Sequence, residues 1–404
     1  DENADLSVIG GQTFTATVNV YSNAKVISEE EQVLRSNTDI KDITIGDTSL
    51  TKVEGKDWNY EVELDSETTT KLNIVPKYSL ANVKIEKDNQ VISNNSEVSL
   101  VGGNNIYKVT ITSTDQTVTK EYKINIKVKQ AVPLKDEIMK NTLVTANPTL
   151  TTSSNNTSDA SGLYKSTATN TGNPTYYFRG NVTNNYVSFA GQTWRIVRIN
   201  EDGTIRIVMQ DGINDNANIT FHANDVNYKY MYYTNNSNAK TTLESWYRTN
   251  IESKSDLAKN VASGAYYCEQ AKVKYSDSAT SGSATMTTYN KYTPDFKCSS
   301  DGNGKGQVNA SVGLLTYDEV VYAGGYYIQN NSNYYLYNSA IHWWTMSPAG
   351  FTGSYAGVWH VRTTGDVHAN DVDSTAGRLR AVLILNADTL VTGTGTSSDP
   401  FVVS

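Results

Sequence analysis

Apolar and polar residues alternate in short runs between residues 43 and 128, as in the stretches 60–64 (YEVEL) and 122–128 (YKINIKV). Glycine and asparagine separate many of these runs. A period of two places successive side chains on opposite faces of a strand. Many short strands of this kind, with polar turns between them, predict an all-β sandwich over residues 37–130.

A Gly10-Gly11 pair leads into a strand-like run near the start of the sequence, as the pair Gly102-Gly103 does further along. The two pairs are separated by about one sandwich length, which suggests an internal repeat. We therefore expect a β segment over residues 1–36. The interpretations that stay open are the end of a preceding, truncated sandwich, an additional strand of the same domain, or a chance match in a sequence rich in Gly and Thr.

Residues 131–161 interrupt the alternating pattern. Pro133 opens a stretch in which acidic residues come early and Leu134 and Ile138 share one side, which predicts a short helix. Residues 149–161 are almost entirely Ser, Thr, Asn and Asp. Because such a segment has little apolar surface to bury, we expect a flexible linker and place the domain boundary there.

Strand-like runs and helical stretches are mixed after this linker. Residues 241–251 carry their apolar side chains on one face, which predicts a helix. A second helix is predicted for residues 316–322, where Thr316 and Glu319 have the spacing of a capping box. The mixture predicts an α+β head domain over residues 162–404.

Composition excludes several classes of protein. The chain has 404 residues and a net charge of -8, from 34 Lys and Arg against 42 Asp and Glu. Without a clustered basic stripe, this charge argues against nucleic acid as a partner. No run approaches the roughly 20 apolar residues of a membrane helix, so we expect no membrane contact by this segment.

Short motifs recur in the sandwich region. They are Ile43-Thr44-Ile45, Tyr60-x-Val62, the turn Gly103-Asn104 and the closing stretch Lys120-Glu121-Tyr122-x-Ile124-x-Ile126. With these motifs the region resembles the cadherin-like sandwiches of bacterial surface proteins. The resemblance covers about a quarter of the chain and implies an immunoglobulin-like, all-β domain.

Longer motifs mark the C-terminal region. They are Gly162-Leu163-Tyr164, Tyr176-Tyr177-Phe178-Arg179-Gly180, Trp194-Arg195-Ile196-Val197-Arg198-Ile199-Asn200, Asp202-Gly203-Thr204-Ile205-Arg206, residues 312–325, Trp344-Thr345-Met346-Ser347-Pro348 and Asp399-Pro400-Phe401-Val402-Val403. With them, residues 162–404 resemble a domain of Gram-positive surface proteins. That domain has the C-type-lectin-like fold of formylglycine-generating enzymes and of the variable proteins of diversity-generating retroelements. The sequence departs from the family's usual motif at Ala381 and Ile384, where Pro and Asn are common.

Cys268 and Cys298 are the two cysteines of the chain. The formylglycine-generating relatives use a reactive, copper-binding cysteine pair near the C-terminal part of the domain, and no cysteine follows position 298 here. We favour a structural disulfide, as expected for one pair in an exported chain. Two free thiols, or a redox or metal-binding pair, are the alternatives.

The sequence offers no established catalytic motif, because a GxSxG elbow, an HExxH motif and a Walker loop are all absent. Residues 301–312 begin like a calcium loop but place Lys305 and Val312 at ligand positions. Residues 211–218 (DGINDNAN) offer oxygen ligands, and an ordinary polar loop explains them equally well. We predict no catalytic residue, no metal site and no cofactor.

Residues 341–373 concentrate side chains that are typical of binding surfaces. The predicted ligand-binding residues are Trp343, Trp344, Phe351, Tyr355, His360, Arg362, Thr364, Asp366, His368, Asn370, Asp371 and Asp373. Strand alternation places Trp359 and Val361 toward the core and His360 and Arg362 outward, together with every second residue as far as Asn370. In the resembled family this outward surface is the one that retroelements diversify. The alternative is that the aromatic residues are half-buried in the sheet and the charged ones are ordinary solvated turn residues.

The resemblances and the exclusions give one functional expectation. The chain would be an exported bacterial cell-surface protein, with its anchor N-terminal to this segment, and would act as an adhesin or ligand-binding protein. Its partner would be a protein or a carbohydrate on another cell or surface, and a variable protein of a diversity-generating retroelement is one form of this function. The alternative is a structural display or assembly module without a ligand, and a formylglycine-generating-like enzyme is a distant third.

Overall fold

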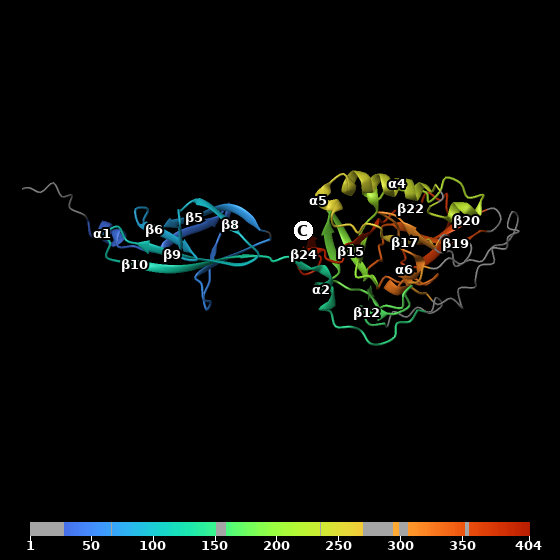
Figure 1. The fold of residues 1–404 in the computed structure, drawn as a ribbon, viewed down its shortest axis with the longest axis horizontal. Helices are drawn as coiled ribbons and strands as arrows, with labels where there is room; N and C mark the ends of the chain where they lie inside the picture. The colour runs from blue at the N-terminus through green and yellow to red at the C-terminus, as the bar shows by residue number, and fades with distance from the viewer. Residues whose placement is uncertain are drawn as a thin grey trace, which may run out of the picture. The chain divides into compact units, whose positions relative to one another are not determined.

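A computed structural model describes residues 28–65, 67–150, 159–234, 236–269, 294–298, 306–351 and 355–404 (Figure 1). Contacts divide the chain into two compact units, Asp1–Val128 and Lys129–Ser404. Most of the regular structure in both units is β-strand, so the chain is a β-rich protein of more than one domain. No helix in the described part of the chain is long and apolar enough to cross a membrane.

The first unit contains two sheets with the strand orders β2-β1-β5-β8 and β3-β4-β10-β9-β6-β7. Their strands are β1 (Ile40–Ile45), β2 (Thr48–Ser49), β3 (Thr51–Lys52), β4 (Tyr60–Leu64), β5 (Thr68–Pro76), β6 (Asn82–Lys87), β7 (Gln90–Ile92), β8 (Ser96–Leu100), β9 (Gly103–Thr112) and β10 (Thr119–Val128). Neighbouring strands are antiparallel, except that β10 is parallel to β4.

The core of the first unit follows the alternation in the sequence. In β9 and β10, residues such as Tyr107, Val109, Ile124 and Ile126 are buried, and most of the residues between them are exposed. Side chains of both sheets join in one apolar cluster. This arrangement is compatible with the predicted β-sandwich, because each strand contributes one apolar face to a shared core.

The sequence predicted a β segment over residues 1–36, but the part of this segment that the structure describes forms a helix. Residues 1–27, with the Gly10-Gly11 pair, lie outside the described residues. The following residues form the helix α1 (Glu29–Arg35), and the side chain of Ser28 accepts the backbone N–H of Glu31. A serine at the N-cap followed by three glutamates favours a helix over a strand.

The second unit is built around a nine-stranded sheet, a four-stranded sheet with the order β21-β20-β19-β22 and a β17-β18 pair. The strands are β11 (Val132–Pro133), β12 (Gly162–Ser166), β13 (Thr175–Arg179), β14 (Tyr186–Phe189), β15 (Gln192–Ile199), β16 (Ile205–Met209), β17 (Tyr266–Glu269), β18 (Gly306–Asn309), β19 (His342–Phe351), β20 (Ala356–Val361), β21 (Val367–Asp371), β22 (Gly377–Arg378), β23 (Val382–Leu385), β24 (Leu390–Thr392) and β25 (Phe401–Val403). One large apolar cluster joins them.

Short helices complete this unit. They are α2 (Leu134–Met139), α3 (Ile213–Asn216), the 3-10 helix η2 (Tyr228–Met231), α4 (Asn238–Tyr247), the π-helical turn η3 (Arg248–Glu252), α5 (Ser255–Ala258) and α6 (Tyr317–Ala323). All three predicted helices are confirmed, as α2, as α4 with η3 and as α6. The capping box of α6 forms as predicted between Thr316 and Glu319.

The sequence predicted a short helix and a flexible linker over residues 131–161. In the structure, the described parts of this segment belong to the second unit instead of linking the two units. Strand β11 pairs with β24, and Leu134 and Ile138 of α2 are buried in the core of the unit. The division therefore falls between Val128 and Lys129 rather than within residues 149–161. A helix with an apolar side must bury that side, and here the head provides the surface.

Candidate functional site

Three adjacent strands carry most of the predicted site. Strand β20 lies between β19 and β21, and both neighbours are antiparallel to it. The turn from β20 to β21 contains Gly365, whose φ of +80° favours glycine. A Cβ at this position would lie 1.8 Å from the backbone oxygen of Asn331, so only glycine fits. The hairpin is thus fixed against the neighbouring loop.

One face of the hairpin packs as the sequence predicts. Trp359 and Val361 are buried, and the Trp359 ring contacts Tyr317 and Tyr327 at centroid distances of 5.0 and 5.6 Å. Thr345 of β19 donates its hydroxyl to the backbone oxygen of Trp359. These contacts anchor β20 in the core.

The opposite face is also covered, which corrects the outward orientation expected for His360. His360 is 5% exposed, and its Nδ1 lies 2.8 Å from the backbone oxygen of His368. Trp344 packs beside it, donates to the backbone oxygen of Ile219 and contacts Phe221. Alternation separates the two faces correctly, but the segment around Phe221 covers the second one.

Burial lowers the pKa of His360 to about 4, because the protonated ring would lose its hydration. His342 and His368 lie near it on the adjacent strands, with ring centroids 5.9 and 6.2 Å from that of His360. In the part of the chain that the structure describes, no group of three or more His, Cys, Asp or Glu side chains is arranged to hold a metal ion.

Asp366 is the second residue that is buried instead of facing outward, with an exposed fraction of 0%. Arg362 donates to both of its oxygens, with Nε 2.9 and 3.1 Å away, and the hydroxyl of Thr364 donates to it as well. Burial opposes ionisation of Asp366, but these donors outweigh it and hold its pKa below the usual value. The buried carboxylate therefore organises the turn.

The remaining aromatic candidates divide between core and surface. Trp343, Trp344 and Phe351 are buried, so a ligand on the surface does not reach them in this conformation. The Arg380 guanidinium lies 4.8 Å from the Trp343 ring centroid on the inner side. Tyr355, by contrast, is 55% exposed. Burial removes the large apolar surfaces of the two indoles and of the phenyl ring from water, which is the main stabilising effect of burying them.

Seven of the predicted residues remain accessible, and we call them the hairpin face, although consecutive residues such as Asn370 and Asp371 lie on opposite sides of β21. They are Tyr355, Arg362, Thr364, His368, Asn370, Asp371 and Asp373. The register pairs Gly357 with Asp371, so the segments next to Tyr355 and Asp373 lie together at the end of the hairpin away from its turn. Arg362 and Thr364 occupy the turn end.

Asp225 and Val226 belong to the same region, and the sequence did not indicate them. The backbone oxygen of Asp225 accepts the N–H of Ala356, and Val226 is 66% exposed. Partial burial raises the pKa of Asp371, and the nearby carboxylates of Asp225 and Asp373 raise it further. No local signal could have found them, because more than a hundred residues separate Asp225 from the hairpin.

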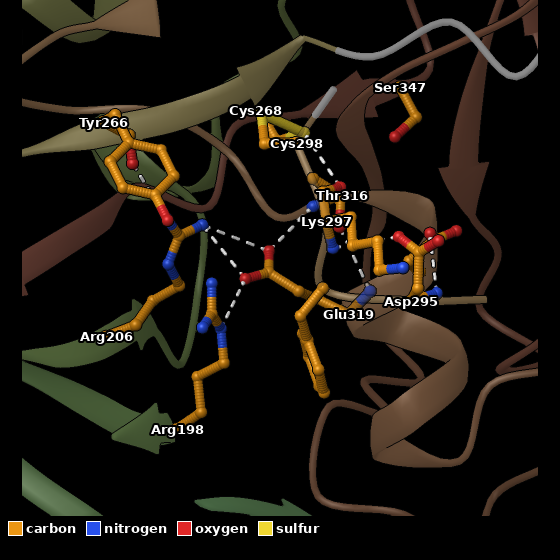
Figure 2. Close-up of a pocket in the computed structure, with 12 residues that line it drawn as sticks. Arg198, Arg206, Tyr266, Cys268, Asp295, Lys297, Cys298, Thr316, Glu319 and Ser347 are labelled. Carbon is orange, nitrogen blue, oxygen red and sulfur yellow. Dashed lines mark hydrogen bonds and ion pairs between the residues drawn. A yellow bond between two sulfur atoms is a disulfide. The ribbon is translucent and has the colours of Figure 1, made fainter. Parts of the chain in front are cut away.

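A partly buried pocket in the same unit contains a charged network (Figure 2). The Glu319 carboxylate accepts from Arg198 Nε and Arg206 Nη1, each at 3.2 Å, and from the backbone N–H of Thr316 at 3.0 Å. Burial disfavours the charge on Glu319, but the two guanidinium groups outweigh it and lower its pKa. One carboxylate thus compensates two buried cations.

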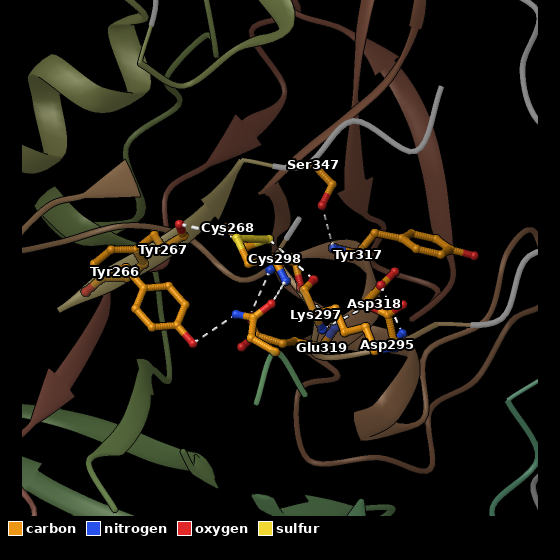
Figure 3. The surroundings of a disulfide bond; sticks show 12 residues. Tyr266, Tyr267, Cys268, Asp295, Lys297, Cys298, Tyr317, Asp318, Glu319 and Ser347 are labelled. Atoms are coloured by element: carbon orange, nitrogen blue, oxygen red, sulfur yellow. Dashed lines mark hydrogen bonds between the residues drawn. A yellow bond between two sulfur atoms is a disulfide. The ribbon is translucent and has the colours of Figure 1, made fainter. Parts of the chain in front are cut away.

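The disulfide between Cys268 and Cys298 forms one wall of this pocket (Figure 3). Their Cα atoms are 5.4 Å apart, and the predicted structural disulfide is confirmed. The strand pair β17-β18 holds Cys268. Cys298 donates its backbone N–H to Asn170, while Phe296 stacks on Tyr322 at 4.0 Å.

The pocket is therefore best described as a structural element. Its three central ionised groups contact one another, and its sulfur atoms are joined in a disulfide. Comparisons of the chain with protein-family models, with curated proteins and with solved structures found no match.

Proposed function

We propose that the chain is an exported bacterial surface protein whose second unit is a recognition head with a C-type-lectin-like fold, and whose first unit is a cadherin-like stalk. The head binds a protein or carbohydrate ligand through the hairpin face without covalent chemistry. Variation of this face by a diversity-generating retroelement is one form of the proposal. A disulfide in the head is consistent with an extracellular location.

The single observation that carries the proposal is the contrast within one hairpin. Trp359, His360 and Asp366 are locked in the interior, whereas Tyr355 and Asp371 stay accessible. A fixed backbone that presents aromatic and hydrogen-bonding side chains loses little entropy when it binds. Tyr, His, Arg and Asn together supply contact area and directional donors and acceptors.

The test is binding of the labelled full chain to an array of printed glycans and extracellular-matrix proteins. The double variant Tyr355→Ala/Asp371→Asn removes an exposed ring and a charge from the hairpin face. The matched control Leu390→Ala/Asp256→Asn removes an exposed apolar side chain and a charge elsewhere in the same unit. We expect the first variant to lose binding and the control to retain it.

The competing function is structural display without a ligand at the head. Equal binding by both double variants would place recognition outside the hairpin face. An absence of binding to every array element by the parent chain would favour the display function. Thermal unfolding of both variants should match the parent, since single exposed side chains rarely change stability by more than about 0.5 kcal/mol.

A further inference from the structure

A polar hollow of about 360 Å³ lies between the start of β15, the loop after β16 and the helices α4 and η3. Its volume falls within the range of about 300 to 1,000 Å³ that is typical of small-molecule sites. Its lining includes the side chains of Gln192, Asp211, Asn214, Asp215, Trp246 and Asn250. None of them belongs to the hairpin face.

The backbone at this hollow is unusual. Asn214, Asp215 and Asn216 of α3 all have left-handed conformations, with φ angles of 51°, 55° and 62°. Each such residue is disfavoured by its Cβ, and Asn and Asp tolerate the conformation best among residues other than glycine. Three in succession require compensation from the surrounding structure, and backbone strain of this kind is concentrated at ligand sites.

Asn216 supplies much of that compensation. Its Oδ1 accepts the N–H of Gly212 at 2.6 Å, and its backbone oxygen accepts Nε of Arg378 at 3.3 Å. By contrast, the side chains of Gln192, Asn214 and Asp215 make no hydrogen bond to the rest of the described chain. The turn is thus held by Asn216 and by the backbone hydrogen bonds of Ile213 and Ala217, and it presents the side chains of Asn214 and Asp215 to the hollow.

We propose that this hollow binds a neutral saccharide. Carboxamides donate and accept, and carboxylates accept, so the lining matches the closely spaced hydroxyl groups of a sugar. The apolar part of the wall comes from Trp246, which is 8% exposed. Asp211 and Asp215 disfavour an anion, and the volume exceeds that of a single metal ion.

Saturation-transfer NMR on the full chain tests the proposal. The probes are methyl α-glucopyranoside, methyl β-galactopyranoside, methyl α-mannopyranoside and N-acetylglucosamine, each at millimolar concentration. We expect transfer to the ring protons of at least one probe. Because the hollow and the hairpin face share no residue, the Tyr355→Ala/Asp371→Asn variant should keep this signal.

Two substitutions each remove one polar side chain from the lining of the hollow and should leave the fold intact. Gln192→Ala shortens an exposed side chain, and Asp215→Gly removes the carboxylate while glycine accepts the left-handed backbone. The matched controls are Gln307→Ala, at another exposed position of the unit, and Asp88→Gly, at a left-handed aspartate of the first unit. We expect Gln192→Ala and Asp215→Gly to lose the saturation-transfer signal, and we expect both controls to keep the signal of the parent chain.

Three results would overturn the proposal. The first is an absence of transfer to all four sugars. The second is transfer that persists in both Gln192→Ala and Asp215→Gly, which would place the sugar elsewhere. The third is calorimetric binding of Ca²⁺ that Asp215→Asn abolishes, without any sugar binding, which would make the hollow a cation site.

Discussion

Replacing Glu319 by Gln tests whether one carboxylate stabilises the second unit by compensating two buried cations. Glutamine has the same shape, and its amide oxygen can still accept the backbone N–H of Thr316, so the helix cap is kept. The substitution removes the charge that faces Arg198 and Arg206. Both guanidinium groups would then stay in the interior with neutral partners.

The magnitude follows from burial. Glu319 is 3% exposed and both arginines are buried, so water cannot replace the lost partner. Breaking a buried ion pair by removing one member costs about 3–5 kcal/mol. For a domain of this size, that loss corresponds to a decrease of roughly 6–20 °C in the thermal unfolding midpoint.

The assay is urea denaturation of the full chain at pH 7, followed by tryptophan fluorescence. Of the six tryptophans, only Trp58 lies in the first unit, so the signal reports mainly on the second. The control is Glu244→Gln, because Glu244 pairs with Lys240 and Arg248 at the partly exposed surface of α4 and η3. A surface pair of this kind contributes about 0–1 kcal/mol.

A double-mutant cycle tests whether the loss of stability comes from the contact between Glu319 and Arg198. Arg198→Met should destabilise the parent, and it should cost less in the Glu319→Gln background, where one uncompensated charge is removed. Contacting residues of this kind show coupling of about 0.5–3 kcal/mol. If Glu319→Gln costs no more than Glu244→Gln, or if the two changes are additive, the network does not stabilise the head as argued.

Three further outcomes are expected. His360 has a folded pKa of about 4 against 6.5 in the unfolded chain, so the unfolded state binds more protons between these values. The contribution of neutral His360 to the free energy of unfolding should therefore be fully present above pH 6.5 and fall by about 3 kcal/mol as the pH decreases to 4. Urea titrations of His360→Gln should show a weaker dependence of stability on pH. Trp359→Ala should cost about 3–5 kcal/mol through an unfilled volume, whereas Tyr355→Ala should stay within about 0.5 kcal/mol; similar losses would show that burial is misassigned. Replacing Cys268 and Cys298 by serine should cost about 3–4 kcal/mol, as expected for closing a separation of 30 residues, and an unchanged midpoint in urea would contradict this.

Local sequence determined the elements of this protein well. The alternation between residues 43 and 128 predicted the strands of the first unit and their buried faces, because side-chain direction along a strand depends only on position. The capping box at Thr316 and Glu319 predicted where α6 begins, since both groups lie within one helical turn. Such signals need only neighbouring residues.

Burial of the candidate site was decided by tertiary structure. Alternation correctly separated Trp359 from His360, but it could not show that residues around Phe221 cover the His360 face. The capping residue Glu319 also compensates Arg198, which lies 121 positions away in the sequence. Periodicity describes which side chains share a face, whereas exposure depends on which distant segment packs against that face, and only the folded chain specifies that contact.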